Sequence, residues 1–175
     1  GKGGPGHETR TLEDGRRLNW RNVNLAEHSL GVAIGGATLA LLDLTHNAPD
    51  VGKGTLREAA AVCFAVGFCH DAPEKYPNAE DFEGFTEFVV SHRVEEFLGK
   101  FGVKIDIETL RRLVDTVEIR TEIATPRDVD CPKFWFRWMV DYVRAADRAE
   151  GLWLLGPPEM AARELKKWAA QFRGL

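Results

Sequence analysis

Apolar residues recur along most of the chain at the three- to four-residue spacing of helices that bury one face. The first such segment, 24–45, begins with Asn24 as a helix N-cap and has Glu27 three residues later, as in a capping box. Pro73 limits a second helix that begins at Thr55. Further helices are predicted over 82–100, 106–122, 133–154 and 159–173, with a short strand around 117–124 as an alternative. The pattern therefore predicts an all-α, single-domain bundle of about five to seven helices.

The first predicted helix has a mixed character. Two adjacent glycines, Gly35 and Gly36, weaken it and indicate close packing against a neighbouring element. Its apolar face also contains a histidine. The residues expected on that face are Leu25, His28, Val32, Leu39 and Leu42.

Composition is ordinary for a soluble globular protein, with 175 residues, 44% hydrophobic and 29% charged. Residues 1–17 are expected to form a flexible leader and residues 18–175 the helical domain. The net charge of −4 disfavours a sequence-independent grip on nucleic acid. Three cysteines without a CxxC pair favour a reducing, cytoplasmic location. No apolar run reaches the roughly 18 residues that a membrane span needs, so no membrane association is expected.

Polar side chains inside apolar segments point to chemistry. His28 interrupts the first helix, His70 and Asp71 follow the apolar run of the second, and Asp147 lies in an apolar stretch of the fifth. Each is costly to bury unless it is paired or bound to a metal. Two imidazoles and two carboxylates suit a divalent transition metal such as Mn, Fe, Co, Ni or Zn, and Mg is also compatible.

The ordered series of His28, His70-Asp71 and Asp147 resembles the H…HD…D signature of the HD-domain metal-dependent phosphohydrolases. The local segments "AEHSLGVA", "HDAPE" and "AADRAE" are similar to that superfamily from about residue 20 to residue 152. "HDAPE" resembles its 5′-deoxynucleotidase and phage-type nucleotide phosphohydrolase branch. The resemblance implies an HD-type helical bundle in which His28, His70, Asp71 and Asp147 bind the metal.

The same resemblance implies roles for residues around the ligands. Glu74, together with Asp71, would be catalytic, with Glu74 orienting or deprotonating the attacking water. Glu74 also stands where the "HDxGK" form of the superfamily has a lysine, which disfavours hydrolases of that form. The residues expected to bind substrate are Trp20, Arg21, Arg17, Lys75 and His92. Trp20 would stack on a base, the arginines and Lys75 would contact phosphate, and His92 would contact phosphate or a second metal. The alternative for each is a packing or solvated residue.

The sequence thus predicts an enzyme that hydrolyses small (deoxy)nucleotides. The products would be nucleoside and phosphate from a dNMP, or nucleoside and triphosphate from a dNTP. One alternative is a CRISPR-associated HD-type single-strand nuclease. Nucleic acid is expected as a partner only under this hypothesis. Another is a non-catalytic HD regulatory module. Assembly into a homo-oligomer is left open.

Overall fold

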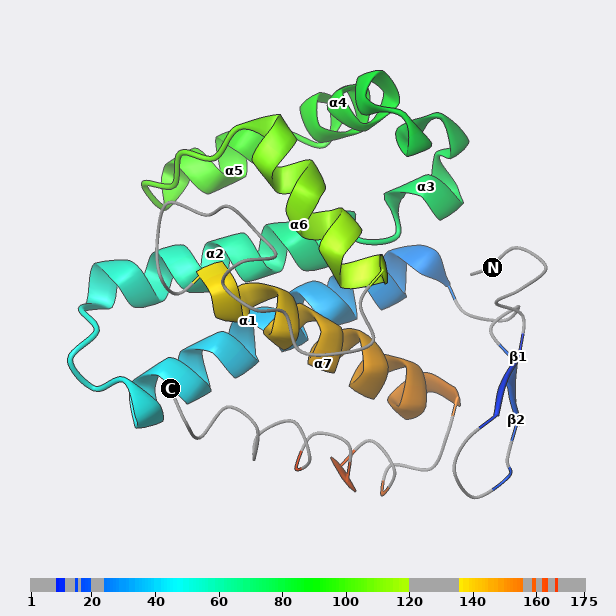
Figure 1. The fold of residues 1–175 in the computed structure, drawn as a ribbon, viewed down its shortest axis with the longest axis horizontal. Helices are drawn as coiled ribbons and strands as arrows, with labels where there is room; N and C mark the ends of the chain where they lie inside the picture. Colours follow the sequence, from blue (N-terminus) through cyan, green and yellow to red (C-terminus); the bar gives the residue numbers. More distant parts are fainter. Residues whose placement is uncertain are drawn as a thin grey trace.

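The computed structural model describes residues 9–11, 15, 17–19, 24–119 and 136–155, and positions 159, 162, 163 and 166 beyond them. Its main body is a bundle of helices (Figure 1), so the predicted all-α, single-domain bundle is confirmed. The helices are α1 (Leu25–Asn47), α2 (Lys53–Cys69), α3 (Ala72–Lys75), the 3₁₀ helix η2 (Pro77–Glu80), α4 (Phe82–Ser91), α5 (Val94–Lys100), α6 (Ile107–Ile119) and α7 (Phe136–Leu155).

A short ribbon precedes the bundle. Strand β1 (Thr9–Thr11) pairs antiparallel with β2 (Arg17–Asn19), with Thr9 opposite Asn19. The sequence pattern did not predict this ribbon, because three-residue strands are too short for alternation to be visible. β1 and the first residue of β2 belong to the segment 1–17 that was expected to be a flexible leader. The flexibility of the rest of that segment stays a prediction.

Three helices form the centre of the bundle. α1 and α2 are antiparallel neighbours, and α7 packs across both (Figure 1). The predicted cap of α1 is confirmed, since the Asn24 side chain accepts hydrogen bonds from the backbone N–H groups of Ala26 and Glu27, at 3.0 and 3.3 Å. A cap of this kind is worth about 1 kcal/mol and fixes where the helix begins. It therefore sets the position of His28, one turn further on.

Small residues let these helices approach closely. A Cβ atom at Gly35 would lie 3.1 Å from Ala146 Cβ, and one at Gly36 would lie 3.3 Å from Val143 Cγ2. The expected packing role of this glycine pair is thus confirmed, with α7 as the partner. A Cβ at Gly67 would lie 2.8 Å from Ala33 Cα, so α1 and α2 nearly touch backbone to backbone at that point.

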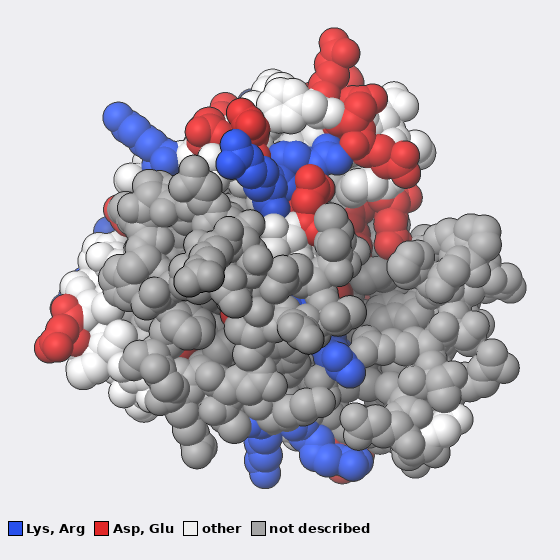
Figure 2. All heavy atoms as spheres, in the orientation of Figure 1, with Lys and Arg blue, Asp and Glu red and all other residues white. Residues whose placement is uncertain are grey.

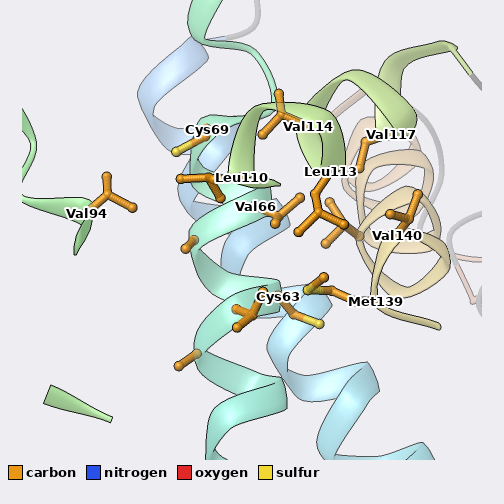
Figure 3. Packing of buried hydrophobic residues seen from close by; sticks show 14 of the residues in the cluster. Cys63, Val66, Cys69, Val94, Leu110, Leu113, Val114, Val117, Met139 and Val140 are labelled. Carbon is orange, nitrogen blue, oxygen red and sulfur yellow. The ribbon is translucent and has the colours of Figure 1, made fainter. Parts of the chain in front are cut away.

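The remaining core is built where α6 closes over α2 and α7 (Figure 3). Apolar side chains of α6 at helical spacing, including Leu110, Leu113 and Val117, point toward Val66 and Met139. Their burial is the dominant favourable contribution to folding in this half of the molecule. α6 thereby joins α2 and α7.

Three local expectations are wrong. Leu42 is 53% exposed, because the buried stripe of α1 there passes through Ala40, Asp43 and Leu44 instead. The single helix predicted over 82–100 is two helices, because Arg93 adopts a left-handed conformation with φ of 53° between α4 and α5. Residues 117–119 belong to α6 and not to a strand. Residues 120–124, and most of the helix predicted over 159–173, lie outside the described residues.

α1 is, among the described helices, the one long and apolar enough to cross a membrane by length and composition alone. A core helix meets the same criterion, and α1 buries His28 and Asp43 against its neighbours. The length and composition of α1 therefore do not show whether the protein is associated with a membrane.

Candidate metal centre

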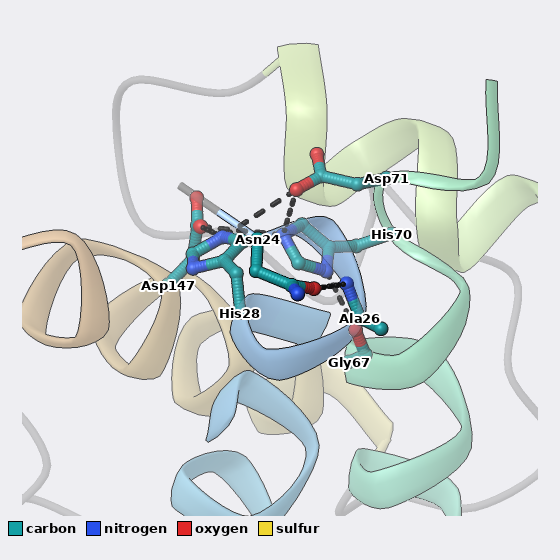
Figure 4. Close-up of polar contacts among 7 residues, drawn as sticks. All are labelled: Asn24, Ala26, His28, Gly67, His70, Asp71 and Asp147. Atoms are coloured by element: carbon teal, nitrogen blue, oxygen red, sulfur yellow. Dashed lines mark hydrogen bonds and ion pairs between the residues drawn. The ribbon is translucent and has the colours of Figure 1, made fainter. Parts of the chain in front are cut away.

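Four polar side chains converge at one end of the three central helices (Figure 4). His28 comes from the first turn of α1, and Asp147 from the middle of α7. His70 and Asp71 come from the two residues that follow α2. The close approach of α1 and α2 at Gly67 brings His28 and His70 together, with ring centroids 5.3 Å apart. Residues separated by more than a hundred positions in the sequence thus form one cluster.

The atoms that face one another are the two Nε2 nitrogens and one oxygen of each carboxylate. His28 Nε2 lies 2.9 Å from Asp147 Oδ1 and 3.4 Å from Asp71 Oδ2. His70 Nε2 lies 3.2 Å from Asp147 Oδ1 and 3.1 Å from Asp71 Oδ2. Each imidazole therefore meets both carboxylates, and the structure brings together all four residues that the sequence predicts as ligands.

Burial closes most of the cluster from water. The side chains of His28 and His70 are fully buried and that of Asp71 is 1% exposed, whereas that of Asp147 is 29% exposed. The cluster is thus accessible from the Asp147 side. A carboxylate and an imidazole buried at this depth need paired charges or a cation to offset lost hydration.

The tautomer of His70 is set by the backbone. Its Nδ1–H donates a hydrogen bond to the Gly67 carbonyl at 2.5 Å, which leaves the Nε2 lone pair directed into the cluster. Metal-binding histidines are commonly oriented by such a hydrogen bond from the other ring nitrogen. The end of α2 therefore holds His70 in an orientation that would suit a metal ligand.

Charge in the cluster favours a cation. Burial lowers the pKa of His70, but the charges of Asp71 and Asp147 and their hydrogen bonds outweigh it and hold that pKa well above its usual value. Without metal, a proton on His70 thus compensates the two carboxylates. A divalent ion would do so with two charges, and it would compete with that proton for Nε2.

The donor set fits a divalent metal. The ligand atoms of His28, His70 and Asp71 lie within 4.8 Å of one another, and Asp147 contacts both imidazoles. Ligands about 2.0–2.2 Å from a shared ion at tetrahedral or cis-octahedral angles are about 2.8–3.6 Å apart. The four contacts measured here fall close to that range, so an ion would need little rearrangement of the chain.

Glu150 is a neighbour of this centre that the sequence reasoning missed. Its carboxylate occupies the space beside Gly31, where an added Cβ would lie 2.3 Å from Glu150 Oε1. Burial and, less strongly, the charge of Asp147 raise the pKa of Glu150, while the charge of His28 lowers it. Glu150 follows Asp147 by one helical turn, and this spacing could have flagged it.

The other predicted site residues differ in their placement. Glu74 lies half-buried in α3 directly after Asp71, and its catalytic role stays a prediction. Lys75 and His92 line a pocket that Asp71 also lines. The side chains of Trp20, Arg21 and Arg17 lie outside the described residues, although the Arg17 backbone pairs in β2.

Cys69, next to His70, takes no part in the centre. It is fully buried, and burial raises the pKa of its thiol to about 12. A thiol that stays protonated is a poor nucleophile, and Cys69 is not among the residues whose ligand atoms cluster at the centre. Its contribution is packing in the core.

No protein-family model, curated protein or solved structure matches this chain. Any functional conclusion therefore rests on the residues themselves and on their geometry.

Proposed function

We propose that this protein is a metal-dependent phosphohydrolase of the HD type that acts on small nucleotides. The observation that carries the proposal is the convergence of His28, His70, Asp71 and Asp147, with Nε2 of both imidazoles within 3.4 Å of both carboxylates. The order and local sequence of these residues resemble the H…HD…D signature, which supports the same assignment.

A divalent ion held by this set would polarise a phosphoryl oxygen and acidify a water molecule, the chemistry that phosphoester hydrolysis needs. The chain supplies the remaining parts. The Gly67 carbonyl keeps His70 Nδ1 protonated, and the exposed edge of Asp147 leaves the centre open to substrate. Glu74, beside Asp71, would take a proton from the attacking water.

Surface charge supports a small substrate over a nucleic acid. Glu80, Asp81, Glu83 and Glu87 are all exposed on η2 and α4, and Figure 2 shows acidic side chains gathered over this part of the molecule. Tyr76, which precedes η2, and Phe88, which belongs to α4, line the pocket beside Asp71. A long phosphate backbone would be repelled here, whereas a mononucleotide would extend only into the pocket.

The test is a product analysis. Purified protein is incubated with Mn²⁺, Co²⁺ or a chelator, and with deoxynucleoside mono- and triphosphates or a single-stranded oligonucleotide. We expect metal-dependent release of nucleoside, with either phosphate or triphosphate as the second product, and an intact oligonucleotide. Asp147→Asn should lose at least about 100-fold in rate, since removal of a group that acts on the transition state typically costs 10²–10³.

Two variants sharpen the result. Glu74→Gln should lose activity while keeping its bound metal, which separates proton transfer from metal binding. His46→Ala changes an exposed histidine in the last turn of α1 and should behave as the unmodified protein. Oligonucleotide cleavage without nucleotide hydrolysis, or full activity in Asp147→Asn, would overturn the proposal.

A further inference from the structure

A pocket of about 110 Å³ adjoins the candidate metal centre. Asp71 forms part of its wall, so a molecule in the pocket lies next to a predicted metal ligand. Room for one water is roughly 10–15 Å³ on this measure, so the pocket holds a group of many atoms. Small and apolar side chains from the start of α1 line one side. The opposite side is lined by Phe68, Lys75, Tyr76, Phe88 and His92.

Four of these residues form an aromatic cluster centred on His92. The His92 ring lies 4.2 Å from that of Phe88, tilted by 30°, and 5.5 Å from that of Tyr76, at 76°. The Phe68 ring lies 5.7 Å from His92. Phe88 is buried and Phe68 half-buried, whereas Tyr76 and His92 are exposed. Two supporting rings thus hold two accessible rings at the pocket.

The backbone holds His92 in this position. His92 Nδ1–H donates to the Phe88 carbonyl at 2.9 Å, and Tyr76 Oη lies 3.5 Å from Nε2. Arg93, the next residue, adopts a left-handed conformation that non-glycine residues rarely take, and it ends α4 there. Such strain is typical of functional positions. The chain accepts it at the residue directly after the exposed imidazole of His92.

We propose that this pocket binds the nucleobase of the substrate, with one of the Tyr76 and His92 rings against its face and the other against its edge, and with the phosphate directed past Asp71 toward the metal centre. The inference rests on the proposed function, which it deepens by placing the base. Aromatic faces bind any nucleobase by stacking, and stacked rings prefer the offset and tilted geometries already present in this cluster. The ammonium group of Lys75, 5.7 Å from the centroid of the Tyr76 ring, lies where it would meet an anionic substrate.

The test compares a deoxynucleoside monophosphate with 2-deoxyribose 5-phosphate, which has the same sugar and phosphate but no base. Tyr76→Ala and His92→Ala should each lower kcat/KM for the nucleotide about 5- to 100-fold, the range measured for loss of base stacking. The loss on 2-deoxyribose 5-phosphate should be much smaller, because this substrate has no base to contact either ring. Tyr76→Phe, which keeps the ring, should retain most of the activity on the nucleotide.

The matched control is Phe82→Ala, which removes an aromatic ring that is 54% exposed on α4 and not part of the pocket. It should not alter the preference for the nucleotide. If Tyr76→Ala does not fold, Tyr76→Leu, which keeps the packing volume without an aromatic face, takes its place. Equal losses on both substrates, or no loss on either, would overturn the base subsite.

A binding measurement separates this inference from the proposed function. Free deoxyadenosine and thymidine are titrated into metal-free protein, and backbone amide shifts are followed by NMR. We expect shifts around Tyr76 and His92 that disappear in His92→Ala. Nucleoside binding without any hydrolysis would refute the phosphohydrolase and leave the subsite standing. Hydrolysis without nucleoside-induced shifts at these residues would refute the subsite alone.

Discussion

At the residue scale, two buried polar side chains of α1 serve different purposes. His28 belongs to the candidate metal centre, whereas Asp43 lies nearer the other end of the helix. Asp43 accepts hydrogen bonds from Tyr142 Oη–H at 2.5 Å and from Asn47 Nδ2–H at 2.6 Å. Burial raises the pKa of Asp43, and these two hydrogen bonds partly counteract the shift. Asp43 is therefore a structural residue whose charge is tolerated only with its donors in place.

Tyr142→Phe should destabilise the protein by about 1–3 kcal/mol at pH 7, because a buried carboxylate then lacks a donor. The pKa of Asp43 should rise further in this variant. Because the pKa of Asp43 is higher in the folded than in the unfolded protein, the ionised carboxylate destabilises the fold, and protonation at lower pH removes this cost. The penalty should therefore be largest at pH 7 and should shrink as the pH falls toward the ordinary carboxyl value of 3.8. Urea denaturation over this pH range measures it.

The double-mutant cycle with Asp43→Asn is the control for this prediction. In that background the group facing Tyr142 no longer ionises, so the cost of Tyr142→Phe should be smaller and independent of pH. An equal, pH-dependent cost in both backgrounds would show that Tyr142 acts through another group.

At the scale of the elements, the contact between α1 and α2 determines whether the two histidines meet. Gly67→Ala would place a methyl group 2.8 Å from Ala33 Cα, and backbone atoms cannot move aside as a flexible side chain can. Overpacking of this kind costs about 1–3 kcal/mol. Since the Gly67 carbonyl also orients His70, we expect weaker Mn²⁺ binding as well. Urea denaturation and metal titration by calorimetry would measure the two effects.

Gly99→Ala is the matched control, because an added Cβ at this position of α5 has nothing within 4 Å. It should leave metal binding unchanged and stabilise the protein slightly, by about 0.5–1 kcal/mol, since alanine is the better helix former. If Gly67→Ala folds and binds metal as the unmodified protein does, the close approach of α1 and α2 is not what positions the centre.

The limits of sequence reasoning are visible in the same elements. Residues 24–45 could be predicted as a helix because the apolar period and the N-cap agree, even though the paired glycines weaken it. The break between α4 and α5 could not, because it has neither glycine nor proline and depends on Arg93 adopting a left-handed conformation. The side of α1 that Leu42 occupies was also misjudged, since period alone does not say where neighbouring helices lie.

At the scale of the whole molecule, no periodic pattern could have shown that His28 and Asp147 touch. Their proximity depends on α7 crossing α1, a tertiary contact. The four residues were predicted as ligands together because their order resembles a known signature. In the structure their side chains lie close together, and metal binding stays a prediction. The aromatic cluster around His92 was missed because its relation to the centre appears only once the helices are packed. Glu150 was missed although its spacing of one helical turn from Asp147 could have indicated it.

Because the ligands come from α1, the end of α2 and α7, a bound ion would link the three central helices, and metal should stabilise the whole fold. A ligand at about 100 times its Kd adds about 2.7 kcal/mol, provided it binds only the folded state. For a domain of this size that raises Tm by about 5–11 °C. Calorimetric melting with saturating Mn²⁺ and with excess chelator should show this difference. The shift should shrink as the pH falls, because protons then compete more strongly with the metal for His70, whose pKa is raised. Asp147→Asn should abolish the shift and His46→Ala should keep it; a full shift in Asp147→Asn would mean that the stabilising ion binds elsewhere.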